Sequence, residues 1–252
     1  ASLELIEFLM DLLRQKPILI LAISRAVQSR ELERIVDWAR QNLGERCHEI
    51  PLEHLSPESS KQLLSLLLSI PDLPEGVRDQ ILTRSAGIPF YLEEILRMLI
   101  DQGLITSQMG RWQIVPGLGL SNLGVPDTLK DLILTRFDRL QTGQRQVLQV
   151  ASVIGKEFSL PILGVVMRTL DAPDLHHTID LLVDREFIQP NQNSPETEFT
   201  FRHVLMSDAI YGTLLRKESS ALHGQVAEAI ERMYIDRQEE HVEVLANHYR
   251  MS

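Results

Sequence analysis

Residues 85–96, Ser-Ala-Gly-Ile-Pro-Phe-Tyr-Leu-Glu-Glu-Ile-Leu, decide how the rest of the chain is interpreted. Gly87 can adopt backbone angles that are closed to other residues, so it can end a helix. Pro89 has a fixed φ and no N–H, which suits the first position of the next helix. The stretch therefore predicts a sharp corner whose second helix begins facing outward, where a helix end can meet a phosphate. The apolar residues of this second helix recur at helical spacing: Phe90, Leu92, Ile95, Leu96 and Leu99.

The chain upstream of this corner alternates between expected helices and strands. Residues 17–23 are apolar without alternation, which is typical of a strand covered on both faces, and this strand ends at Arg25. A helix is expected over 30–43 and a short strand over 47–52. Such alternation favours a parallel α/β domain, and two strands cannot form that sheet alone. We therefore expect residues 1–55 to be the C-terminal part of an α/β domain whose other strands lie upstream.

The chain around the corner is predicted to form a small helical domain. Helices are expected over 57–69 and 75–86, and together with the corner helix they make a helical lid over 56–103. Two short apolar strands follow and flank a turn, which predicts a hairpin. A segment rich in glycine and proline comes next, so we assign 104–126 to a hairpin and linker.

The last half of the chain is predicted to be mainly helical. Four helices followed by strands at 187–189 and 199–201 are typical of a winged helix, which we place at 127–203. Residues 204–252 are amphipathic and resemble the first helices of a tetratricopeptide-like array, although no 34-residue period is visible. The predicted fold class is therefore mainly α with a partial parallel α/β sheet.

Three segments together resemble one protein family. The Gly-x-Pro motif at 87–89 follows an apolar strand ending in arginine by about sixty residues, which resembles the lid of STAND-class signal-transduction P-loop ATPases. This class includes AAA and NB-ARC-like modules of LuxR-type and maltose-activator-type regulators and of bacterial nucleotide cyclases. Residues 201–203, Phe-Arg-His, resemble the segment after the wing in this family, and residues 245–249 resemble its run into the repeats. The chain contains no G-x-x-x-x-G-K-[ST] motif and no apolar strand ending in paired acidic residues. The resemblance therefore implies a fragment that starts after the Walker B strand.

The resemblance implies roles for four residues in nucleotide binding. Arg25 stands at the carboxyl end of a central strand, where ligands of open α/β sheets bind, and matches the family's phosphate sensor. Gly87 and Pro89 match the Gly-x-Pro motif, whose proline lies against the bound base and ribose. Pro51 precedes the lid and would line the adenine side. The alternatives are a surface arginine paired with an acidic residue and an ordinary corner between helices.

The resemblance also implies the cofactors. The parent protein would bind ATP or ADP with Mg²⁺, whereas this fragment alone would hold neither tightly. We expect no catalytic residue, because both Walker motifs are absent from these residues. The eight histidines show no HExxH spacing, so no metal site is expected.

Composition limits the partners and the compartment. The 252 residues carry a net charge of −10, and the expected recognition helix at 175–186 carries Asp180, Asp184 and Glu186 against one arginine. Such a helix is repelled by DNA phosphates, so binding of nucleic acid is not expected. The single Cys47 excludes an internal disulfide and indicates a reducing, cytoplasmic setting. No apolar run reaches about 18 residues, so no membrane span is expected.

Three functions stay open from the sequence. The first is a regulatory fragment that couples the ATP/ADP state, sensed by Arg25 and the lid, to the winged helix and a downstream effector. Its partners would be the missing N-terminal part of the ATPase domain, effector or repeat domains, or a second copy. That effector would be a cyclase, a kinase or a transcription regulator. The second function is a DNA-binding winged-helix regulator or an origin-recognition-like AAA protein. The third is a protein-interaction adaptor without nucleotide sensing.

Overall fold

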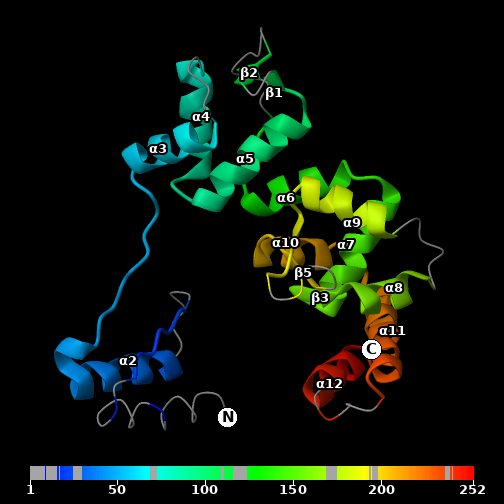
Figure 1. Cartoon of the computed structure of the whole chain (residues 1–252). Helices are drawn as coiled ribbons and strands as arrows, with labels where there is room; N and C mark the ends of the chain where they lie inside the picture. The colour runs from blue at the N-terminus through cyan, green and yellow to red at the C-terminus, as the bar shows by residue number, and fades with distance from the viewer. Residues whose placement is uncertain are drawn as a thin grey trace. The chain divides into compact units, whose positions relative to one another are not determined.

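The structure is a computed structural model that describes residues 9, 16, 18–24, 30–68, 73–108, 111–115, 124–168, 175–192, 194, 198–235, 239 and 241–252 (Figure 1). The chain divides into two compact units, Ala1–Glu53 and His54–Ser252, and each is described by itself. The described residues are mainly helical, with two small antiparallel sheets. The helical part of the predicted fold class is therefore confirmed.

The first unit contains α2 (Arg30–Leu43), as predicted, and the short helix η1 (Gly44–Arg46). The predicted parallel sheet is not shown. Residues 18–24 and 47–52 have no regular secondary structure and pair with no strand among the described residues. Leu19 and Ile23 are 91% and 87% exposed. A parallel strand is stable only between hydrogen-bonded neighbours with both faces covered, and the described part of this unit supplies neither.

The second unit begins with three helices, α3 (Pro57–Leu67), α4 (Glu75–Ser85) and α5 (Pro89–Asp101). Ser56 caps α3 as expected, because its hydroxyl accepts the backbone N–H of Ser59. The predicted hairpin is confirmed: β1 (Ile105–Gln108) pairs antiparallel with β2 (Arg111–Ile114). An upstream core fills the space between these elements. It consists of Leu64, Leu68, Leu73, Val77, Ile81, Tyr91, Leu92, Ile95, Leu96, Met98, Leu99, Ile105 and Leu132.

A second group of elements runs from α6 (Leu129–Asp138) through α7 (Thr142–Ile154), β3 (Glu157–Ser159), α8 (Leu160–Arg168) and α9 (Leu175–Asp184) to β4 (Ile188–Pro190) and β5 (Glu198–Phe201). The strands form one antiparallel sheet in the order β3-β5-β4. The two later strands were predicted, whereas β3 was not. This strand has three residues and one buried apolar side chain, so it carries little local signal.

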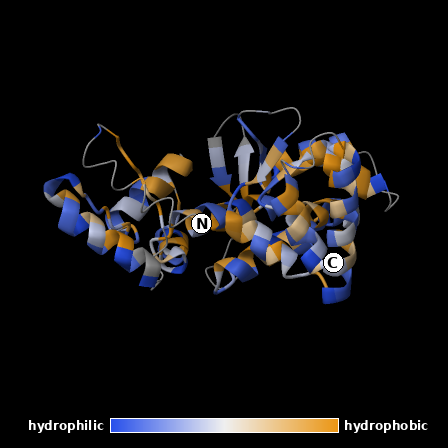
Figure 2. Cartoon of the chain, turned by 90° about the horizontal axis from the view of Figure 1, so that it is seen from below, coloured by the Kyte–Doolittle hydropathy of each residue, from blue (hydrophilic) through white to orange (hydrophobic). Residues whose placement is uncertain are grey.

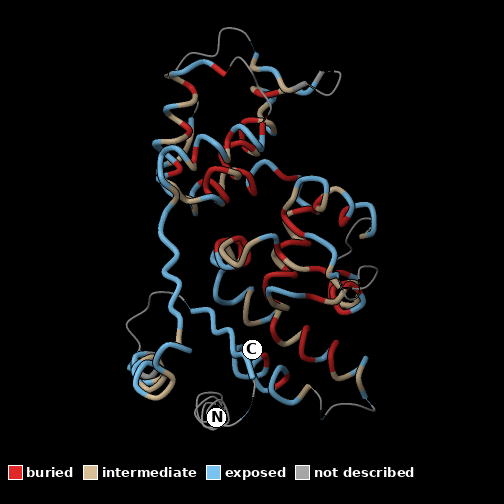
Figure 3. Tube along the Cα trace, turned by 60° about the vertical axis from the view of Figure 1, so that its left-hand side comes forward, coloured by how far each residue is buried: buried red, intermediate tan, exposed pale blue. Residues whose placement is uncertain are grey.

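Three helices complete the chain: α10 (Val204–Tyr211), α11 (Arg216–Met233) and α12 (Val242–Met251). A downstream core joins α6 to α12 and includes Ile133, Leu148, Leu163, Leu182, Phe201, Met206, Ile210 and Val226. The helices are amphipathic, with apolar and polar stretches alternating along them (Figure 2). Buried residues gather in the second unit, whereas the described residues of the first are exposed or intermediate (Figure 3). No helix in the described ranges has the length and apolar character needed to cross a bilayer.

Candidate functional site

The predicted corner between α4 and α5 is present. Helix α4 ends at Ser85, and both Ala86 (φ 49°) and Gly87 (φ 73°) then take the left-handed conformation. The N–H of Ile88 donates to the carbonyl of Ser85 at 2.8 Å, which closes the turn. Pro89 is the first residue of α5, where its missing N–H costs no hydrogen bond. The turn geometry is therefore as the sequence predicted.

Gly87 is also required by a close backbone approach. The N–H of Leu55 donates to the carbonyl of Gly87 at 2.8 Å. A Cβ on Gly87 would lie 2.4 Å from the carbonyl oxygen of Leu55 and 3.1 Å from Cβ of His54. Any side chain at this position would push the two segments apart. The stretch that enters the second unit is thus fastened directly to the corner.

An aromatic contact joins the corner to the downstream elements. The rings of Phe90, next to Pro89, and His203 stack with centroids 4.1 Å apart and planes inclined by 14°. His203 caps α10, because its Nδ1 accepts the N–H of Leu205 at 3.1 Å. The Phe-Arg-His segment at 201–203, for which the sequence suggested no chemistry, therefore lies against the candidate nucleotide corner.

A buried arginine forms a second connection between the two groups of elements. Arg136 of α6 donates through Nη1 to Glu94 Oε2 at 2.5 Å and through Nε to Asp101 Oδ2 at 3.1 Å, and both acids belong to α5. Its Nη2 donates to the carbonyl of Arg185 at 2.7 Å, after α9. The guanidinium carbon lies 4.7 Å from the ring centroid of Phe187. One side chain thus contacts α5, the end of α9 and the start of the sheet.

The pair between Arg136 and Glu94 is nearly free of water, with side chains 1% and 3% exposed. Burial raises the pKa of Glu94, and the charge and hydrogen bond of Arg136 limit that rise. A buried pair of this kind is costly to break, because the remaining charge loses its partner without regaining water. The connection between α5 and α6 is therefore a fixed one.

The structure brings together two of the four predicted site residues. Gly87 and Pro89 lie in the same turn. Pro51 is exposed in a segment of the first unit without regular structure, and Arg25 lies outside the described residues. The convergence of all four around one nucleotide stays a prediction.

Sequence reasoning missed Phe90, His203, Glu94 and Arg136 as members of this region. A signal was present for the last two, since each charged residue lies three or four positions from apolar residues of its own helix. A charge in that position is expected to find a buried partner. The identity of the partner depends on tertiary contacts between distant segments, which no local pattern encodes.

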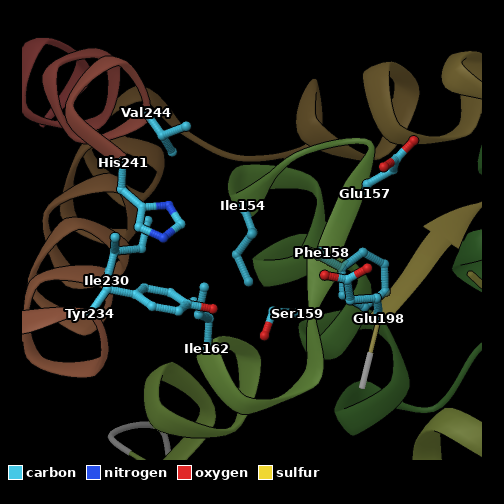
Figure 4. Close-up of a pocket in the computed structure, with 10 residues that line it drawn as sticks. All are labelled: Ile154, Glu157, Phe158, Ser159, Ile162, Glu198, Ile230, Tyr234, His241 and Val244. Atoms are coloured by element: carbon cyan, nitrogen blue, oxygen red, sulfur yellow. The ribbon is translucent and has the colours of Figure 1, made fainter. Parts of the chain in front are cut away.

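A hollow of about 270 Å³ lies elsewhere in the second unit (Figure 4). The rings of Tyr234 and His241, with centroids 4.1 Å apart, stand on one side, and Glu157 and Glu198 belong to the neighbouring strands. It shares no residue with the corner. The described ranges hold no group of three or more potential metal ligands. The residues lining the hollow are Ile154, Glu157, Phe158, Ser159, Ile162, Glu198, Ile230, Tyr234, His241 and Val244.

Comparison with known proteins gives distant similarities. No family model matches the chain. An uncharacterized protein of Rhizobium meliloti (strain 1021) is 25% identical over 146 residues, which covers 58% of this chain and 13% of that protein. Adenylate cyclase type 10 of Rattus norvegicus is 21% identical over 221 residues, covering 73% of this chain and 14% of the cyclase. Adenylate cyclase type 10 of Mus musculus is 21% identical over 229 residues, covering 71% of this chain and 14% of that enzyme. The chain thus spans 13–14% of the length of these curated relatives. Its similarity to adenylate cyclase type 10 is to a region of that enzyme.

Proposed function

We propose that this chain is the regulatory segment of a STAND-type signal-transduction ATPase. Residues 1–55 would belong to the ATPase α/β domain, 56–103 would form the helical lid and 127–203 the winged helix. The order α7-β3-α8-α9-β4-β5, with β5 central in an antiparallel sheet, supports the winged-helix assignment. The Gly-x-Pro corner at 87–89, joined to that domain by a ring stack, is the observation that carries the proposal.

In this proposal the nucleotide state of the parent ATPase acts on the corner. The start of α5 carries backbone N–H groups and the positive end of the helix dipole, so it is suited to the anionic side of a nucleotide. ATP and ADP would contact the lid differently, and that difference is what can shift its position. Because Arg136 fixes α5 to α6, a shift of the lid would carry the winged helix with it. The similarity to adenylate cyclase type 10 supports a nucleotide cyclase as the effector.

The winged helix in this proposal faces protein rather than DNA. Its helix α9 contains Asp180 and Asp184 and no lysine or arginine, and the whole chain carries a charge of −10. Phosphate contacts require cations, so this face would be repelled from a duplex. Downstream domains of the same parent protein are the expected partners.

The test uses a parent protein that contains this chain together with a phosphate loop. Pro89→Ala is expected to change the rate of ADP release, measured with a fluorescent nucleotide, by about tenfold. Pro57→Ala is the matched control, because Pro57 also begins a helix but stands outside the corner. The 252-residue chain alone is expected to show no ATP turnover. Turnover that survives controls for contaminating ATPase, or equal effects of both proline variants, would contradict the proposal.

A further inference from the structure

The turn after α9 contains a glutamate where glycine is usual. The N–H of Phe187 donates to the carbonyl of Leu182 at 3.0 Å, and the N–H of Glu186 donates to that of Val183 at 2.8 Å. These two bonds form a Schellman motif, with Asp184 as the last helical residue and Arg185 as the C-cap. Glu186 takes the left-handed position at φ 55°. A side chain there crowds the backbone, so glycine would be the less strained choice.

The side chain of Glu186 connects three distant segments. Its carboxylate pairs with Arg97 of α5 through Oε1. Through Oε2 it faces Arg202, just after β5, with 3.6 Å between Oε2 and Nη2 of the arginine. Glycine at this position would relieve the backbone but remove both pairs. The strain is therefore retained where the side chain bridges the lid helix and the sheet.

This outer set of ion pairs lies beside the buried arginine described above. The side chains of Arg97, Glu186 and Arg202 are 35%, 28% and 39% exposed. Those of Arg136 and Glu94 are 1% and 3% exposed. The outer pairs can open into water and close again at small cost, whereas the inner pair cannot. The two sets therefore differ in how easily they are released.

We propose that Glu186 is a releasable latch between α5 and the sheet, and that Arg136 is the pivot about which α5 moves when the latch opens. With the latch closed, α5 and the turn before β4 move as one body. With it open, α5 keeps its buried contact with Arg136 and the stack of Phe90 on His203, but it loses its ion pair with the turn before β4. The inference deepens the proposed function by naming how a movement of the lid reaches the winged helix, and its test requires no nucleotide.

The test compares two substitutions by hydrogen–deuterium exchange of the 252-residue protein. Glu186→Gln removes the charge and keeps the backbone strain, whereas Glu186→Gly removes both. In each variant the amides of α5 are expected to exchange about fivefold faster relative to those of α11. The thermal midpoint should fall for Glu186→Gln and should stay at or above that of the wild type for Glu186→Gly.

Two further variants complete the experiment. Arg97→Ala should accelerate α5 exchange to the same degree, and adding Glu186→Gln to it should give no further increase, because the two residues share one interaction. Glu228→Gln is the matched control, since Glu228 pairs with Arg232 within α11. That control should leave α5 exchange unchanged.

The latch proposal is contradicted if Glu186→Gly leaves the exchange rate of the α5 amides unchanged. It is also contradicted if that rate rises only in variants whose thermal midpoint falls. A failure of the proposed nucleotide switch is a separate result. It would appear as an ADP release rate insensitive to Pro89→Ala, while the exchange rates of the Glu186 variants would still differ from the wild type.

Discussion

Gly87 is the residue on which the corner depends, for two separate reasons. Its φ of 73° lies in the left-handed region that favours glycine, and a Cβ there would meet the backbone of Leu55 and Cβ of His54. Gly103 shares the first property at φ 67° but has nothing within 4 Å of the place a Cβ would occupy. Substituting each glycine therefore separates the free-energy cost of the left-handed φ from the cost of the close contact with residues 54–55.

Gly87→Ala is expected to lower the free energy of unfolding by about 2–4 kcal/mol, from backbone strain and the clash with the Leu55 carbonyl. Gly103→Ala should cost about 1–2 kcal/mol, from strain alone. Urea unfolding of the 252-residue protein measures both. If both variants lose the same free energy of unfolding, the segment at residues 54–55 moves aside for the new Cβ without an energetic cost.

At the scale of elements, α10, α11 and α12 are joined by a chain of aromatic side chains. The Tyr211 hydroxyl lies 3.1 Å from Nε2 of His223, whose Nδ1 lies 2.8 Å from Nδ1 of His248. One of the two facing Nδ1 atoms must carry the proton and the other accept it, so at least one ring is neutral at that atom. Burial lowers the pKa of both histidines, and the pKa of His248 falls to about 4, with His223 adding to the effect.

This cluster predicts that acid destabilises the C-terminal helices. The pKa of His248 is lower in the folded state than its ordinary value of 6.5, so the unfolded chain binds the proton first. The contribution of His248 to the free energy of unfolding is therefore fully present above pH 6.5 and is lost as the pH drops toward 4. We expect this loss to be about 2 kcal/mol, a value that allows for screening by solvent. Thermal unfolding between pH 4 and 7 measures this slope.

His248→Gln should remove most of that slope, because the amide does not titrate. The exposed His48 gives the matched control, since His48→Gln removes an imidazole outside the cluster. If the wild type and both variants lose stability equally between pH 7 and pH 4, the acid sensitivity does not arise from His248.

The elements also show what the sequence could predict. Local chemistry was sufficient for the corner at 87–89, for the cap at Ser56 and for the hairpin, because each depends on neighbouring residues. It was insufficient for β3, because its three residues carry too little local signal and the strand is stabilised by its pairing with β5. The contacts of Arg136 and the stack on Phe90 join segments distant in sequence, so no periodicity indicates them.

At the scale of the whole molecule, the two units differ in how much they bury. Both apolar cores are built from residues of the second unit, and the described residues of the first are exposed or intermediate. The predicted strand at 17–23 supplied an apolar pattern, but a sheet needs partner strands as well as pattern. The sequence therefore predicted the second unit better than the first.

This division predicts that residues 54–252 fold without the first unit. Their free energy of unfolding should match the corresponding transition of the whole chain within about 1 kcal/mol, because both cores are retained. Urea unfolding followed by circular dichroism compares the two proteins. A shortened chain that is molten or aggregates would show that residues 1–53 complete one of the cores.

The hydrogen bond from Leu55 to Gly87 has a mechanical consequence. Tension applied to the chain just before His54 does not have to travel through α3 and α4 to be felt downstream. It reaches Gly87, in the turn just before α5, so a pull on the entry to this unit acts directly on the start of that helix.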